Sequence, residues 1–554
     1  MTQCNRRTIT IGLIGSFIAL VNLILIYHFH PTFNEFPSTQ PLPPPPRPAP
    51  PPLEPPKHYG IPLVRPPQHE RKFVSTAVDD FIKNVSMAFQ DPDLAILLQN
   101  CLPNTLDTTI EWYRLRDDPR TFLITGDIPA MWIRDSTNQI LPYLSMASLD
   151  RRLQDLILGV LVVQASYLHY DPYANAFLRP WYAPNFRFRD GRTDQVVPHY
   201  DPNLVWESKY ELDSLAHFLE LANEYMTVTG DIERVVRSED WVKALPRVFQ
   251  VIRHQMRGSW EEPVLSSVEW PLHHRPPVTY LGGNRSYIET PEPLPVNNGY
   301  RFKRFTDRPT ETLGENGIGG ISRQCGLVRS AFRPSDDATT FPYLIPANAQ
   351  LTVNLGRLAK HLQDAFKKFN DLAPELKDIA REAETLSDTI RKAIYEHAVV
   401  EHPRFGKIFA YEVDCYGSQL LMDDANTPSL LSLPILGFVD TQDTVYQNTR
   451  AFVLSQNNPW YFEGAFAQGV GSPHTGRDMI WPMSLLMQIQ TSTSENEIRL
   501  LLETLKRLSS KTGLMCESFH KDQPARFTRP WFSWANGLAG STLISVFQRF
   551  PHLV

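Results

Sequence analysis

The sequence has few cysteines and lacks the short motifs that mark common metal, nucleotide and serine-hydrolase sites. Its five cysteines, Cys4, Cys101, Cys325, Cys415 and Cys516, show no CxxC or CxH spacing, which argues against a zinc site built on thiolates. There is no HExxH or HxxEH pattern, no EF-hand layout of acids, no phosphate-binding loop, no GxGxxG after a strand and no GxSxG. We therefore expect no cofactor. The later cysteines leave room for one or two disulfides, whose pairing the spacing does not define.

Clustered positive charge is also missing. The 554 residues carry a formal net charge of -6, with 42% hydrophobic and 21% charged residues. This balance describes a mildly acidic globular chain with enough apolar residues for a large core, and it lacks the basic footprint of a nucleic-acid-binding protein. We expect no nucleic-acid partner, and the composition does not define the oligomeric state.

One long run without charge lies near the N-terminus. Residues 8–29 are apolar apart from Asn22, and the run is long enough to cross a bilayer as a helix. It is not followed by the small residues of a signal-peptide cleavage site, so we expect an uncleaved anchor. Arg6 and Arg7 precede it, and positive flanks stay cytoplasmic. The sequence thus predicts a type II protein of the secretory pathway, in the Golgi or endoplasmic reticulum, with residues 1–7 in the cytoplasm and the rest in the lumen.

A proline-rich stalk follows the predicted anchor. Residues 30–70 contain the run PLPPPPRPAPPPLEPP, which favours an extended polyproline conformation over helix or sheet. An SH3-binding segment is the alternative, disfavoured by the expected luminal placement. Two sequons, at Asn84 and Asn284, fit that placement because N-glycosylation occurs on the luminal side.

The body, residues 71–554, has mostly helical periodicity. Apolar residues at three- and four-residue spacing predict an all-α fold with these helices: 151–170, 208–225, 347–369, 371–397, 440–454, 478–490, 496–510 and 530–547. Short strands are expected only in the Pro- and Gly-rich region 264–304. Long helices in succession, with chemistry in the loops between them, predict helical hairpins closed into a ring.

Five loops combine aromatic rings with carboxylates, amides and arginines. They are residues 126–138 (GDIPAMWIRDSTN), 199–214, 415–434, 469–482 and 516–536. A sugar needs this combination, because its C–H faces pack on aromatic rings while its hydroxyl groups require polar partners. One such loop is explained equally well by core packing or helix capping, but five together predict a carbohydrate site.

Hydrolysis of a glycosidic bond needs one carboxyl group as acid and a second as base or nucleophile. Asp213 lies among apolar residues at the start of a predicted helix, where burial would raise its pKa. Glu207 and Glu211 compete for the same role, and their spacing does not separate them. Glu517 lies near Arg526 and Arg529, which would keep it ionised, and a structural ion pair with Arg529 is an equally good explanation of this Glu.

Asp423 and Asp424 form a third candidate pair. The string DDAN before Thr427 and Pro428 is also typical of a turn and helix cap. A calcium ion bound by Asp423, Asp424 and Asn426 is the remaining metal hypothesis.

Taken in order, GDIPAMWIRDSTNQ, YELDSL, MDDANTPSLLSLP, GSPHTGRDMIWP and ESFHKDQPARFTRPWFSWAN resemble the motifs of the metal-independent exo-α-1,6-mannosidases of glycoside hydrolase family 125. The resemblance runs from about residue 71 to the C-terminus, and the anchor and stalk look like those of membrane-tethered fungal members. It implies an (α/α)6 barrel and an inverting reaction without metal, with Asp213 as general acid and Glu517 as general base.

The resemblance also implies a substrate-binding set for a mannose-containing glycan. Its members are Trp132, Arg134, Asp135, Asp424, Asn426, His474, Trp481, Arg529, Trp531 and Asn536. Because Asp135 adjoins Arg134, we expect a lowered pKa that keeps Asp135 ionised to accept hydroxyl hydrogen bonds. Residues 264–315 look like an insertion relative to short bacterial members. The alternatives are a glucoside-specific glycosidase of the same barrel type and a non-catalytic mannose-binding protein.

Overall fold

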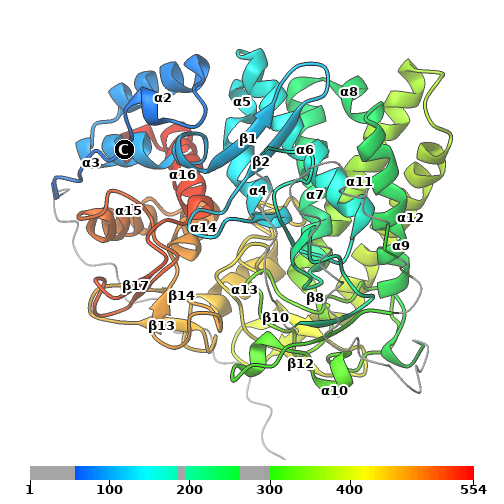
Figure 1. The fold of residues 1–554 in the computed structure, drawn as a ribbon. Coiled ribbons are helices and arrows are strands. Elements are labelled where there is room, and N and C mark those ends of the chain that lie inside the picture. The colour runs from blue at the N-terminus through cyan, green and yellow to red at the C-terminus, as the bar shows by residue number, and fades with distance from the viewer. Residues whose placement is uncertain (1–56, 185–193, 262–292, 295, 297–298) are drawn as a thin grey trace, which may run out of the picture. The chain divides into compact units, whose positions relative to one another are not determined.

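The computed structural model describes residues 57–184, 194–261, 293–294, 296 and 299–554 (Figure 1). The predicted tail 1–7, anchor 8–29, most of the stalk 30–70 and the sequon at Asn284 lie outside these residues. Within the described part, no helix is both long and apolar enough to cross a membrane. All contacts discussed below lie within the unit Pro48–Val554.

Helices dominate the described body. The longer ones are α2 (Thr76–Ala88), α3 (Pro92–Cys101), α4 (Ile133–Ile140), α6 (Arg151–Tyr170), α7 (Leu212–Thr229), α9 (Glu239–Gln255), α11 (Ile345–Lys368), α12 (Glu375–His397), α13 (Thr444–Val453), α14 (Pro482–Thr491), α15 (Glu495–Ser509) and α16 (Ser533–Arg549). Short helices occur at α5 (Leu144–Ala147), α8 (Ile232–Val236) and α10 (Gly314–Gly317).

The predicted helices are confirmed, with small shifts at their ends. Capping side chains explain several starts: Asp150 accepts hydrogen bonds from the first backbone N–H groups of α6, Asp443 caps α13 and Ser494 caps α15. Five helices begin three or four residues later than predicted, and local structure explains two of these late starts, those of α14 and α7. Helix α14 starts at Pro482, whose fixed φ suits the first helical turn.

Helix α7 begins at Leu212 instead of the predicted residue 208. Tertiary contacts hold the preceding segment extended: the Tyr210 N–H donates to the Tyr300 hydroxyl, and the Leu212 N–H donates to the Ser330 hydroxyl. Glu211 also forms a β-bridge with Phe332. The helical spacing of apolar residues continues through residues 208–211, but the backbone of these residues is not helical.

The helices pack in pairs, some of which are neighbours in the sequence and others of which are not. Helix α11 packs against α12 and α7, α6 packs against α9, and α14 packs against α16. In Figure 1, α11 and α12 lie side by side. Helix α6 buries nearly all of its residues, whereas α12 and α15 bury one apolar face and expose charged residues on the other. This distribution makes α6 a central helix and α12 and α15 outer ones.

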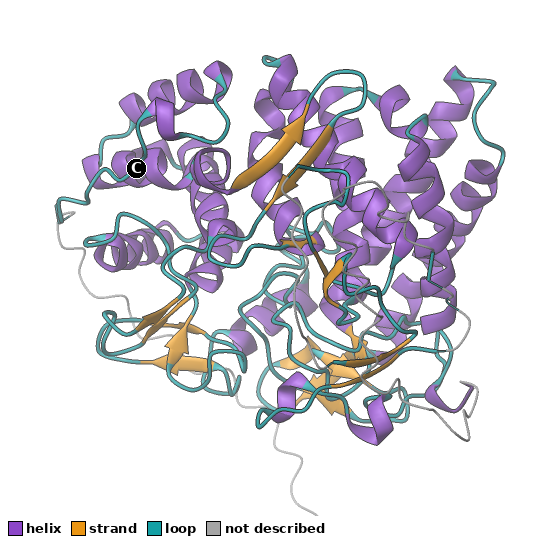
Figure 2. Cartoon of the chain, in the orientation of Figure 1, coloured by secondary structure: helices purple, strands orange, loops and turns teal. Residues whose placement is uncertain are grey.

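The chain is rich in helices, as predicted, but short strands also occur outside residues 264–304, where the sequence did not predict them (Figure 2). They are β1 (Ile110–Arg114), β2 (Arg120–Leu123), β3 (Met131–Trp132), β4 (Ala176–Phe177), β5 (Gln195–Val197), β6 (Val205–Glu207), β7 (Arg301–Lys303), β8 (Tyr343–Leu344), β9 (Val399–His402), β10 (Gly406–Phe409), β11 (Glu412–Val413), β12 (Gln419–Leu420), β13 (Tyr461–Glu463), β14 (Gln468–Val470), β15 (Met479–Ile480), β16 (Ser518–His520) and β17 (Phe527–Thr528).

These strands form antiparallel sheets of two or three strands. The order β3–β4–β6 places Trp132 opposite Ala176 and Ala176 opposite Glu207, and β15–β16–β17 pairs the segment before α14 with the segment after Glu517. Strands this short carry too few apolar residues for a sequence pattern, so only the tertiary structure reveals them. They tie together the loops that enter different helices.

Gly126 brings the first of these loops against the last. Its φ is +137°, and a Cβ atom there would lie 2.3 Å from the Trp531 carbonyl oxygen. Gly126 also forms a β-bridge with Phe532. Only glycine permits this approach, which brings the loops before α4 and α16 together.

Candidate active site

A cavity of about 340 Å³ lies where the predicted sugar-binding loops meet. Eight of the twelve predicted site residues line it: Trp132, Arg134, Asp135, Asn426, His474, Trp481, Glu517 and Arg529. These eight residues come from four of the five predicted loops, so the structure brings together side chains that lie up to nearly 400 positions apart in the sequence. The volume falls within the usual range of small-ligand sites, roughly 300–1,000 Å³.

Two of the remaining predicted residues support the cavity from behind. Asp424 is buried and accepts hydrogen bonds from the Asn426 amide and the Ser472 hydroxyl, so it fixes Asn426 without lining the cavity itself. Asn536 is fully buried in α16 and hydrogen-bonds both the N–H and the carbonyl of Met515. It holds the segment that leads to Glu517.

Trp531 lies beside a different cavity. This second cavity, of about 390 Å³, is lined by residues 64–66 and residues around Asn104, and the Trp531 indole N–H donates to the Thr108 hydroxyl at 3.2 Å. Trp531 therefore does not line the cavity that contains Glu517, although its neighbour Phe532 does.

Asp213 is fully buried and is not among the residues that line the cavity. Its Oδ2 lies 3.6 Å from Arg134 Nη1 and 3.8 Å from His217 Nδ1. Burial raises the pKa of Asp213 to about 7, although Arg134 works against this, so the predicted rise is confirmed. The group is protonatable, but it lies beneath Arg134 and not at the cavity wall.

Arg134 is the centre of this part of the site. Its Nη1 lies 2.6 Å from Glu211 Oε2, its Nη2 lies 3.4 Å from Asp336 Oδ1, and its Nε lies 3.3 Å from Asp135 Oδ2. With Asp213, four carboxyl groups surround one guanidinium that is almost completely buried. A single cation does not compensate four buried charges, so some of these carboxyl groups must retain protons.

The pKa values follow from this crowding. Burial raises the pKa of Glu211 well above its ordinary value despite the opposing charge of Arg134. Burial also acts to raise the pKa of Asp336, but Arg134 and Lys209 outweigh it and hold that pKa well below its ordinary value. The predicted lowering of the Asp135 pKa is wrong in direction: Arg134 does lower it, but burial raises it by more.

Several polar atoms of the lining residues are buried without a hydrogen-bond partner among the described residues. They include the Trp132 indole N–H, the Ser335 hydroxyl and Asp135 Oδ2, which lies 3.3 Å from Arg134 Nε but is not hydrogen-bonded to it. Because a buried polar group without a partner costs free energy, these atoms are suited to a ligand that carries many hydroxyl groups. Their placement supports the predicted contacts of Trp132 and Asp135 with a sugar.

Glu517 lies on the side of the cavity formed by the last loop. Its carboxylate is 3.3 Å from Arg529 Nη1, and Arg529 Nη2 is also 2.6 Å from Asp127. The Glu517 N–H is bonded to the carbonyls of Thr528 and Arg529. Arg529 thus positions Glu517, and the loop of Gly126 supplies the second carboxylate that holds Arg529.

The structure adds residues that the sequence did not single out for binding. Asp336 lines the cavity with a side chain that is 22% exposed, and Trp206, Glu207 and Lys209 line it from β6 and the following loop. Asp336 occurs in the string RPSDDATT, which has no aromatic residue and is typical of a polar turn, so no local signal marks it. The sequence marks Glu207 only as an alternative to Asp213 for the role of acid.

The described end of the insertion-like region also reaches the cavity. Arg304 and Glu311 line it, and Arg304 is held by Asp194 at 2.7 Å and by Glu207 at 2.9 Å. In the described part of residues 264–315, these two side chains form part of the cavity wall.

Asp423 has a structural role. Its two carboxyl oxygens accept the backbone N–H groups of Leu430 and Leu431 at 2.8 and 3.0 Å. This supports the alternative interpretation of DDAN as a turn cap. The oxygens that a calcium ion would require on Asp423 are thus already engaged in backbone hydrogen bonds.

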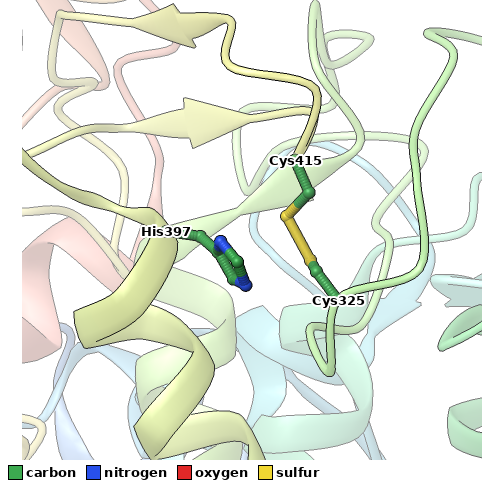
Figure 3. Close-up of side chains that lie close together, drawn as sticks. All are labelled: Cys325, His397 and Cys415. Atoms are coloured by element: carbon green, nitrogen blue, oxygen red, sulfur yellow. A yellow bond between two sulfur atoms is a disulfide. The ribbon is translucent and has the colours of Figure 1, made fainter.

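Cys325 and Cys415 form a disulfide, and His397 lies next to it (Figure 3). Three such side chains could bind a metal ion only with free thiolates, and the disulfide consumes both. Cys101 and Cys516 are free and buried. The bridge therefore joins the loop before α11 to the turn after β11.

A small polar cavity lined by tryptophans, with two separate groups of acidic side chains, is typical of an enzyme that acts on carbohydrates. The profile of the family "Metal-independent alpha-mannosidase (GH125)" matches residues 91–544. The chain belongs to this family and is a glycoside hydrolase.

Relatives in fungi and bacteria agree with this assignment. The chain is 44% identical over 497 residues to the "Meiotically up-regulated gene 157 protein" of Schizosaccharomyces pombe (strain 972 / ATCC 24843), covering 89% of this chain and 90% of that protein. It is similar, with a TM-score of 0.72 and 33% identity, to a Streptococcus pneumoniae metal-independent α-mannosidase solved in a non-productive substrate complex with α-1,6-mannobiose. That match covers 86% of this chain and 99% of the bacterial one.

We predict that Arg134→Met destabilises the protein by about 3–5 kcal/mol at pH 7, because it leaves buried carboxyl groups without their cation. This loss of unfolding free energy should become smaller as the pH is lowered from 7 to 5. Without Arg134 the buried carboxyls keep higher pKa values than in the unfolded chain, so lower pH favours the folded state. Urea denaturation at both pH values measures this.

Arg253→Met is the matched control, because Arg253 forms an exposed ion pair with Glu382. Such a pair contributes about 0–1 kcal/mol. Equal losses for the two variants, or a loss at Arg134 that does not change with pH, would contradict the role assigned to Arg134.

Proposed function

We propose that the protein removes non-reducing terminal α-1,6-linked mannose from glycans, with inversion at the anomeric carbon and without a metal ion. The observation that carries the proposal is the cavity in which the loops of the family motifs place Arg134, Asp135 and Glu517 together. The complex of the streptococcal relative with α-1,6-mannobiose supports the linkage. A compact cavity, unlike a long groove, suits a chain end, and we further propose that the helical hairpins close into the (α/α)6 barrel of the family.

In an inverting reaction, one carboxylate takes a proton from water while a carboxylic acid on the opposite side protonates the leaving oxygen. Glu517 is suited to the first role, because it lines the cavity and Arg529 keeps its carboxylate in place. The water oxygen bonds to the anomeric carbon as the glycosidic bond breaks, and the leaving oxygen takes the electron pair and the proton.

Residue spacing alone does not identify the general acid. The geometry of the cavity favours Asp336 over Asp213 for this role. A proton donor must come within hydrogen-bonding distance of the leaving oxygen. Asp336 lines the cavity with a partly exposed carboxyl group, whereas the Asp213 side chain has no exposed surface. Asp213 instead lies behind Arg134, where its Oδ2 is 3.6 Å from Arg134 Nη1 and helps to keep that guanidinium in position.

The first test incubates the detergent-solubilised full-length protein with α-1,2-, α-1,3- and α-1,6-linked mannobiose, with and without a chelator. We expect mannose release from the α-1,6 isomer alone, unaffected by the chelator, and β-mannose as the first product by proton NMR. Release of α-mannose first would exclude inversion. Activity only on glucosides would favour the glucosidase alternative, and tight sugar binding without turnover would favour a lectin.

The second test separates the two acid candidates. Asp336→Asn should reduce mannobiose hydrolysis by about 10²–10⁴-fold, the usual contribution of a general acid. Its effect on dinitrophenyl α-mannoside should be much smaller, because that leaving group departs without protonation. Asp213→Asn should reduce both substrates to a similar and smaller extent. The opposite pattern, with selective loss at Asp213, would restore Asp213 as the acid.

We also propose that residues 8–29 anchor the protein in a membrane of the secretory pathway, with the catalytic body in the lumen. The Cys325–Cys415 disulfide is typical of an oxidising compartment, and Asn84 of the first sequon is exposed on α2.

This placement predicts that the body is protected from protease in sealed microsomes and that Asn84→Gln reduces the apparent mass by one glycan. Deletion of residues 8–29 should abolish both properties. A protein that is digested in intact microsomes, with no mass change at Asn84, would contradict luminal placement.

A further inference from the structure

Glu211 has no role in the reaction described so far, yet it is the carboxyl group most closely associated with Asp336. The side chains of Glu211 and Asp336 are in hydrogen-bonding contact with each other. Glu211 is fully buried, whereas Asp336 is 22% exposed and lines the cavity. One member of the pair therefore faces the ligand and the other is shielded from solvent.

Two side chains, those of Arg134 and Asn175, each contact both carboxyl groups of this pair. Arg134 places Nη1 2.6 Å from Glu211 and Nη2 3.4 Å from Asp336. Asn175 donates through Nδ2 to Glu211 Oε1 at 3.0 Å and to Asp336 Oδ1 at 3.3 Å. The backbone of Asp336 is fixed as well, because its carbonyl accepts a hydrogen bond from Lys209 Nζ at 2.7 Å and its φ is +67°. The two carboxyl groups are thus held at a fixed separation.

Two carboxylates in contact cannot both ionise without strong repulsion, so such a pair usually keeps one proton between its members. The surrounding charges do not remove this constraint. The titratable and charged groups that face the pair are Arg134, Asp135, Lys209, Asp213 and His474, and Glu207 approaches through Asn175 and Lys209. Acidic groups are at least as numerous as cations.

We propose that Glu211 and Asp336 form a carboxyl dyad that holds one catalytic proton, with Asp336 as the member that delivers it and Glu211 as a positioning residue that retains it. This inference rests on the proposed function and on Asp336 as its acid. Glu211 acts through Asp336 and does not touch the substrate.

In the reaction, Asp336 transfers the shared proton to the glycosidic oxygen, which takes the electron pair of the breaking bond. Water, deprotonated by Glu517, completes the new bond at the anomeric carbon. The dyad is then doubly ionised and is stabilised by Arg134 and Lys209. Proton exchange through solvent returns the proton from Glu517 to the dyad, so the cycle consumes only water.

The test is the Glu211→Gln variant of the full-length protein, assayed across pH on α-1,6-mannobiose and on dinitrophenyl α-mannoside. Glutamine keeps the size and a hydrogen-bonding oxygen but cannot ionise or share the proton. Arg134 and Lys209 should then keep Asp336 ionised to lower pH. We expect the descending limb of the mannobiose pH profile to move down by about 1–2 pH units.

At neutral pH this shift should reduce kcat for mannobiose at least tenfold, with little change in KM. The kcat for dinitrophenyl α-mannoside should fall much less, because its leaving group departs without an acid. Asp213→Asn is the matched control, since Asp213 is an equally buried partner of the same guanidinium at 3.6 Å. The descending limb of the pH profile of Asp213→Asn should move less than that of Glu211→Gln.

An unmoved limb in a folded Glu211→Gln variant, or equal losses on both substrates, would overturn the dyad. Failure of the proposed function is recognised separately, since then Asp336→Asn shows no dependence on the leaving group. If Glu211→Gln does not fold, Asn175→Ala replaces it. Removing that donor destabilises the ionised pair, so the limb should move to higher pH, and a limb that stays in place would equally overturn the dyad.

Discussion

The active site depends on one buried arginine. Arg134 lies at the start of α4, and its guanidinium contacts carboxyl groups from its own helix, from the start of α7 and from the loop that precedes α11. No single pair explains its burial, because desolvating a guanidinium costs several kcal/mol and each carboxylate costs a similar amount. The cluster is tolerable only because it is shared, partly protonated and further hydrogen-bonded. These segments are therefore coupled: moving one leaves a buried charge without its partner.

The same cluster explains why the local sequence was a good guide to the first loop and a poor guide to the charge states within it. Adjacent Arg134 and Asp135 suggest a simple ion pair with an ionised carboxylate. The folded chain brings Glu211 and Asp336 to the same guanidinium, so its charge is divided, and burial then outweighs its effect on Asp135. Periodicity and capping predicted the helices to within a few residues, because those signals lie in consecutive side chains.

The candidate site was predictable wherever a loop carried both an aromatic ring and polar groups. Trp132, His474, Trp481 and Arg529 satisfy that condition and line the cavity. Asp336 does not, since a Ser-Asp-Asp turn is typical of ordinary surface loops, and its position at the cavity results from contacts with Lys209, Asn175 and Arg134 that are distant in sequence. Conversely, Trp531 and Asn536 stand in the right motif but face a second cavity and the core, respectively.

The arrangement of acids also bears on how Asp336 can deliver a proton although two cations, Arg134 and Lys209, lie beside it. An isolated aspartate beside Arg134 and Lys209 would be ionised at neutral pH and would be a poor proton donor. A second, buried carboxyl group in contact with it changes this, because the pair as a whole resists losing its last proton. Burial raises the pKa of Glu211, so Glu211 retains the proton that Asp336 passes to the leaving oxygen, while the cations stabilise the doubly ionised product. On this argument Glu211, a buried acid of the YELDS segment, sets the proton supply of a carboxyl group that comes from another loop.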